Sequence, residues 1–80
     1  MTDIAHHIKE KFPDDEPAID HLMAQDPEFC TICEDYDTCI TALQYWIDSN
    51  APEAGIRMNE YRSLIEGLET EAAQAIAALK

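Results

Sequence analysis

Basic residues, glycine and long apolar runs are scarce in this 80-residue sequence, and each scarcity excludes a class of protein. Five lysines and arginines stand against 17 acids, which gives a formal net charge of −12 at pH 7. No lysine or arginine occurs between Lys11 and Arg57. Because nucleic acids and anionic membranes attract proteins through lysine and arginine, neither is expected to be a partner.

Motifs of catalysis and of secretion are also missing. With Gly55 and Gly67 as the only glycines, there is no loop to cradle phosphate, and no nucleophile-elbow or metalloprotease motif occurs. No run approaches the roughly 20 apolar residues of a membrane span, and the first residues lack the apolar core of a signal peptide. Three cysteines, an odd number, suit reduced thiols. We therefore expect a cytoplasmic protein that is no enzyme and has no cofactor.

What the sequence does contain is helical periodicity. Asp26-Pro27-Glu28 is typical of a helix start, because aspartate caps the first turn and proline suits the first helical position. Apolar residues then recur every three or four positions, without glycine or proline, as far as Pro52. This spacing predicts a helix over 27–49. Its apolar residues are Phe29, Cys33, Tyr36, Ile40, Leu43 and Ile47, widened by Ile32, Cys39 and Trp46.

A second long helix is predicted over 52–79. Asn50 and Glu53 resemble a capping box, with Pro52 in the first turn. Two such helices joined by a short turn are expected to pack together as an antiparallel hairpin. The apolar residues of the second helix are Met58, Tyr61, Ile65, Leu68, Ala72, Ala75 and Leu79.

Two shorter helices are predicted before this hairpin. The first covers 3–12, with Thr2 or Asp3 as its cap and Pro13 as its end, and the second covers 17–25. The apolar stripe of the first long helix is too wide for one partner helix, which predicts a second contact. Either the N-terminal arm or another subunit could make that contact.

The predicted fold is therefore all-α, with one small domain over 1–80. An antiparallel hairpin forms its body, and the short helix over 17–25 is expected to cover the open side of the stripe. The arm over 1–16 either docks on the hairpin or stays mobile, and the sequence leaves both open.

Three stretches between Ile19 and Ile76 resemble a known family. They are Asp26-Pro27-Glu28-Phe29 at the start of the first long helix, Glu34-Asp35-Tyr36-Asp37 soon after it, and Glu60-Tyr61-Arg62-Ser63-Leu64 in the second helix. With the polar turn between the helices, they resemble the YdcH-like small bacterial helical hairpin proteins. The resemblance implies a self-associating hairpin without assigned catalytic activity, and it transfers no functional residues. The chain departs from the family at Leu68-Glu69-Thr70-Glu71, where a lysine-rich segment is usual.

The cysteines form the most suggestive chemical cluster. Cys30 and Cys33 make a CxxC pair at a helix start, which could act in redox chemistry or hold zinc, with Cys39 and His21 as the remaining candidate ligands. Neighbouring carboxylates disfavour thiolate, and a single CxxC lacks a second ligand pair. The favoured interpretation is that Cys33 and Cys39 are buried small apolar residues and Cys30 is an exposed thiol. A small protein that uses these cysteines for thiol chemistry or metal binding stays the alternative.

The leading hypothesis is a non-enzymatic interaction protein. Its surplus apolar stripe would bind a second copy, for example in a homodimer, or a helix of another protein, and its acidic exterior could attract a basic partner. The candidate contact residues are Ile32, Cys39, Tyr45 and Trp46.

Overall fold

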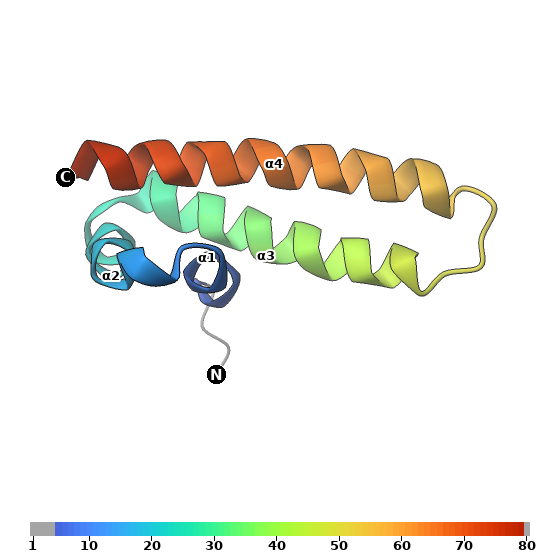
Figure 1. Ribbon diagram of the computed structural model, residues 1–80, viewed down its shortest axis with the longest axis horizontal. Helices are drawn as coiled ribbons and strands as arrows, with labels where there is room; N and C mark the ends of the chain where they lie inside the picture. Colours follow the sequence, from blue (N-terminus) through green and yellow to red (C-terminus); the bar gives the residue numbers. More distant parts are fainter. Residues whose placement is uncertain (1–4, 80) are drawn as a thin grey trace.

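The computed structural model describes residues 5–79, and this part of the chain is helical and without strands. The all-α prediction is confirmed (Figure 1). In chain order, the elements are α1 (His6–Lys11), the short 3-10 helix η1 (Pro13–Asp15), α2 (Glu16–Gln25), α3 (Pro27–Ile47) and α4 (Ala54–Leu79).

The two long helices, α3 and α4, run antiparallel along the 44 Å length of the molecule (Figure 1). α3 begins at the predicted residue, because the Asp26 carboxylate accepts hydrogen bonds from the backbone N–H groups of Glu28 and Phe29, at 3.0 and 3.4 Å. Pro27 occupies the first helical turn, where its missing N–H leaves no bond unmade. The predicted hairpin is confirmed.

The turn between α3 and α4 is longer than predicted. α3 ends at Ile47 instead of 49, and α4 begins at Ala54 instead of 52. The predicted capping box is wrong, because within the described chain no hydrogen bond joins Asn50 to Glu53. The Ser49 hydroxyl instead accepts from the Ala51 N–H at 3.1 Å. The Ala54 N–H closes a tighter turn on the Ala51 carbonyl at 3.1 Å, and the Arg57 N–H donates to the Glu53 carbonyl at 3.1 Å, so the α-helix starts only after Glu53.

The short helices α1 and α2 pack on the end of the hairpin where α3 begins and α4 ends (Figure 1). α1 contacts α3, and α2 contacts both long helices. Phe12 ends α1 in a non-helical conformation, as expected of a residue before proline. The predicted caps Thr2 and Asp3 lie outside the described residues. From Ala5 onward the N-terminal arm is docked, which answers the question that the sequence left open.

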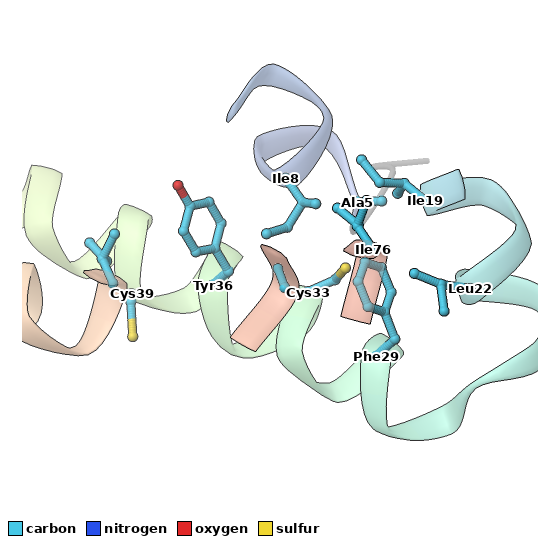
Figure 2. Close-up of a cluster of buried hydrophobic side chains, with 11 residues drawn as sticks. Ala5, Ile8, Ile19, Leu22, Phe29, Cys33, Tyr36, Cys39 and Ile76 are labelled. Atoms are coloured by element: carbon cyan, nitrogen blue, oxygen red, sulfur yellow. The ribbon is translucent and has the colours of Figure 1, made fainter. Parts of the chain in front are cut away.

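The core lies at this four-helix end of the molecule (Figure 2). Its largest fully buried side chains come from three helices, which therefore share one core: they are Ile8 of α1, Ile19 of α2, and Phe29 and Cys33 of α3. α4 closes the core with Ile65, Ala72 and Ile76. The second contact predicted for the wide stripe of α3 is therefore made here by the chain's own N-terminal helices.

Two residues predicted to be core are exposed. Ile47 is 54% exposed at the last turn of α3, and Leu79 is 41% exposed at the end of α4. Both follow the helical spacing correctly. Ile47 stands at the turn end, where no third helix of the described chain covers it, and Leu79 stands in the last turn of α4, beyond the buried Ile76. Periodicity alone therefore overestimates the core at the helix ends.

Candidate interaction surface

A groove runs between α3 and α4 on the side of the hairpin that α1 and α2 leave uncovered. We call it the open groove. It contains two hollows of about 510 and 270 Å³, each large enough for a side chain of a partner. Apolar side chains from both long helices form its floor, and carboxylates stand on its rim. The floor consists of Ile32, Cys39, Leu64, Leu68 and Ala75, and the rim acids are Asp26, Glu28, Asp35 and Glu71.

Helical geometry explains why these residues share one side. Ile32 and Cys39 are two turns apart on α3, so their side chains fall in one line. Tyr36 and Ile40 project to the other side of α3, where they line a hollow together with residues of α1. In Figure 2 the ring of Tyr36 points toward the level of α1, and the sulfur of Cys39 points away from it. The two faces of the hairpin are thus lined by different residues.

The four predicted contact residues divide between two places. Ile32 and Cys39 line the open groove. Tyr45 and Trp46 lie at the turn end of α3, where Tyr45 is 67% exposed and its ring meets that of Trp46 edge to face, with centroids 5.1 Å apart. The structure therefore does not gather the four into one patch.

Sequence reasoning missed the contribution of α4. Leu64 is 55% exposed and lines the open groove opposite Cys39, next to the half-buried Leu68. The available signal was Leu64 itself, a large apolar residue next to the core position Ile65 that the heptad spacing does not require. Leu64 was not recognised because it lies outside the predicted stripe.

The rim of the open groove is acidic, and no lysine or arginine in the described part of the chain lines its hollows. Three of the described cations are engaged elsewhere. The Nζ of Lys9 lies 2.8 Å from Oδ1 of Asp20, the Nζ of Lys11 lies 3.8 Å from Oε2 of Glu69, and Arg57 pairs with Glu60 at 3.1 Å. Among residues 5–79, no lysine or arginine forms an ion pair with a rim carboxylate.

The thiol of Cys39 belongs to the apolar floor. Its side chain is 9% exposed, and burial raises the pKa of the thiol, with the negative charge of Asp35 adding to the effect. A raised pKa keeps the sulfur protonated and poorly nucleophilic. Cys39 therefore offers a contact surface and no reactive thiolate.

The four candidate metal ligands are not brought together. Cys30 donates its S–H to the Met23 carbonyl at 3.1 Å, Cys33 is buried in the core, and His21 is exposed on α2. Across residues 5–79, no three His, Cys, Asp or Glu side chains form a group that could hold a metal ion. All three cysteines are described, and none is in a disulfide. The expectation of an exposed Cys30 is wrong, because the residue is half-buried and its thiol contacts the Met23 carbonyl of α2.

Tyr36 supports the face opposite the open groove. Its hydroxyl donates to Oε2 of Glu69 at 2.7 Å, the same oxygen that Lys11 approaches, so one carboxylate ties α1, α3 and α4 together. Burial raises the pKa of Tyr36 well above its usual value, and the Glu69 carboxylate raises it further. This contact is structural, because the buried hydroxyl is already committed to Glu69.

No helix within residues 5–79 combines the length and apolar character that crossing a membrane requires. The chain matches no protein-family model, no curated protein and no solved structure. The likeness to YdcH-like hairpin proteins therefore stays a prediction.

Proposed function

We propose that this chain is a non-enzymatic interaction module that binds a helix, from a partner protein or from a second copy, in the open groove. One observation carries the proposal. Apolar side chains of both long helices, among them Ile32, Leu64 and Leu68, line one side of the hairpin, where no part of the described chain covers them. A groove between two helices is a common docking site for an amphipathic helix.

The other side of the hairpin supports this proposal, because a helix already occupies it. α1 buries Ile8 completely against the hairpin, and Ala5 is buried beside it. The pair α3–α4 thus accepts a short third helix on one side and offers an apolar floor of the same kind on the other.

The net charge and the cysteines narrow the class of partner and the compartment in which it would be met. A net charge of −12 disfavours nucleic acid and anionic membrane as partners, because both repel carboxylates. Three cysteines outside any disulfide suit a reducing compartment such as the cytoplasm. A protein partner in that compartment is the proposed target.

Site-specific photo-crosslinking in the native cell tests the proposal. A benzophenone amino acid in place of Leu64 should capture a helical segment, which mass spectrometry of the adduct identifies. The matched control is the same amino acid in place of Ser63, which is exposed but does not line the groove. Equal adducts from both positions, or none from either, would contradict the proposal.

The alternative of thiol or metal binding has less support, because its four candidate residues lie apart. Metal analysis of protein purified without chelator tests it separately. A stoichiometric metal that is lost when Cys30 and Cys33 are both replaced by alanine would favour this alternative over the interaction module.

A further inference from the structure

We infer that the occupant of the open groove is a basic amphipathic helix of a partner protein and not a second copy of this chain. The inference rests on the proposed function and narrows it to one class of partner. The carboxylates of Glu28, Asp35 and Glu71 flank the apolar floor, and no lysine or arginine within residues 5–79 lies within ion-pair distance of them. A ligand with apolar anchors between lysines or arginines complements this arrangement.

The dimensions of the groove suit a helix. From Glu28 to Cys39, α3 rises about 16 Å at 1.5 Å per residue, which is the length of three helical turns. The two hollows follow each other along this rise, the first beside Ile32 and the second beside Cys39. Apolar side chains spaced three and four residues apart on one helix would reach both hollows.

The chain itself holds a helix of this chemistry on the other side of the hairpin. α1 buries Ile8 in the core, and its basic side chains on either side reach carboxylates of the long helices. Nδ1 of His7 lies 2.7 Å from Oδ1 of Asp37, and Nζ of Lys11 lies 3.8 Å from Oε2 of Glu69. An apolar anchor between basic residues is thus the pattern that this acidic hairpin already accepts.

A second copy is a poor occupant for electrostatic reasons. A two-fold interface places the same surface of both copies together, so the rim carboxylates of one copy would face those of the other. Each copy carries a net charge of −12, and separations within such an interface are shorter than the roughly 8 Å over which physiological salt screens charge. Like charges brought this close oppose association.

A pair of synthetic peptides tests the inference on the full-length protein. Both have about 18 residues, long enough to form a helix on binding, and leucines spaced three and four apart. One peptide carries lysine at the flanking positions and the other carries glutamate. Fluorescence anisotropy of the labelled peptides should show binding of the lysine peptide alone, with an affinity that falls as salt is added.

Two matched double variants test whether the lysine peptide binds through the carboxylates of the groove rim. Asp35→Asn with Glu71→Gln removes two rim charges and should weaken binding of the lysine peptide about 3- to 10-fold, since each exposed ion pair contributes little. The control, Glu34→Gln with Glu66→Gln, removes two exposed charges that do not line the groove, and should leave binding unchanged. Leu64→Ser removes apolar contact and should weaken binding further. Circular dichroism checks that each variant remains helical.

Several outcomes would overturn the inference. Equal binding of the lysine and glutamate peptides would leave a helix-binding groove, and so the proposed function, but would remove the basic partner. If neither peptide bound but crosslinking from position 64 still captured a protein, the proposed function would also stand and the basic partner would be ruled out. Light scattering that shows a dimer of the protein alone, dissociated by Leu64→Ser, would make a second copy the occupant. Backbone NMR shifts confined to α1 and α2 would place the lysine peptide on the wrong side.

Discussion

The two ends of the hairpin are built from the same two helices, yet only one of them is a packed core. Where α3 begins, Phe29 and Cys33 are fully buried, because α1, α2 and α4 all surround them. At the turn end, Ile47 and Ile56 are large apolar residues that face solvent, and Ile56 is 66% exposed. An amphipathic stripe is therefore buried only where enough neighbouring helices exist to cover its width.

Polar contacts show the same asymmetry. At the covered end, Glu69 joins α4 to Tyr36 of α3 and to Lys11 of α1, and Asp37 meets His7. At the turn end, the side-chain contacts are local ones, such as the Ser49 hydroxyl with the Ala51 N–H. Contacts between distant segments resist local opening better than contacts within a turn. The covered end should therefore carry most of the stability.

The largest expected effect comes from removing the phenyl ring at the centre of the covered end. Phe29→Ala should lower the free energy of unfolding by about 3 to 5 kcal/mol, because a fully buried side chain is replaced by a cavity. Urea denaturation followed by circular dichroism measures this change. In a small domain such a loss can prevent folding, so the milder Phe29→Leu should be measured beside it.

The control for Phe29 lies on the same helix at the other end. Ile47→Ala should change the free energy of unfolding by less than about 1 kcal/mol, because most of the side chain is already in water. Similar losses for Phe29→Ala and Ile47→Ala would refute the contrast between the two ends.

The next effect tests whether the docked arm stabilises the hairpin. Ile8→Ala should cost about 2 to 4 kcal/mol, because Ile8 is the fully buried residue through which α1 enters the core. Ile56→Ala, with the same chemical change at an exposed position, should cost a few tenths of a kcal/mol. Hydrogen exchange should show that Ile8→Ala loosens the start of α3 more than its last turns. Unchanged protection there would mean that the arm rests on the hairpin without stabilising it.

The helices could be predicted from the sequence, but which parts of them are covered could not. The long helices followed from periodicity and from the cap at Asp26, since both are local properties. The docking of α1 could not be predicted, because a short helix with one apolar face can dock on the hairpin or remain in solvent. The exposure of Ile47 was missed for the same reason, since spacing identifies a face but not the neighbour that covers it.

The candidate surface was predicted only in part. Ile32 and Cys39 were identified because they widen the stripe of α3 beyond one partner. Leu64 and the rim acid Glu71 come from α4, and the register between the two helices decides which residues of α4 stand opposite Cys39. That register depends on the turn, which extends two residues further at each end than predicted.

A smaller effect concerns the hydroxyl of Tyr36. Tyr36→Phe removes its hydrogen bond to Glu69 and should cost about 1 to 2 kcal/mol. The pKa of Tyr36 is raised in the folded state, so its contribution is fully present below the unfolded value of about 10 and is lost as the pH rises through the folded value. Stability measured from pH 8 to 11 should therefore fall less steeply in Tyr36→Phe than in the native protein.

The matched control for this pH dependence is Tyr45→Phe at the turn end. Tyr45 is exposed, and the same substitution there should leave both the stability and its alkaline slope unchanged. If Tyr45→Phe flattened the slope as much as Tyr36→Phe, the loss at high pH would reflect general charge repulsion in this acidic chain and not the Tyr36–Glu69 contact.

The smallest effect compares the two glycines of α4. A methyl group at Gly67 or Gly55 would meet no atom within 4 Å, so alanine fits at either position without strain. Gly67→Ala should stabilise the protein by about 0.5 to 1 kcal/mol, because alanine restricts the unfolded chain and favours helix. Gly55 lies in the first turn of α4, at the uncovered end, where a frayed helix gains less from helix propensity. Equal gains at both positions in urea denaturation would mean that α4 is as firmly helical beside the turn as it is at its centre, and the contrast between the two ends would then concern side-chain cover alone.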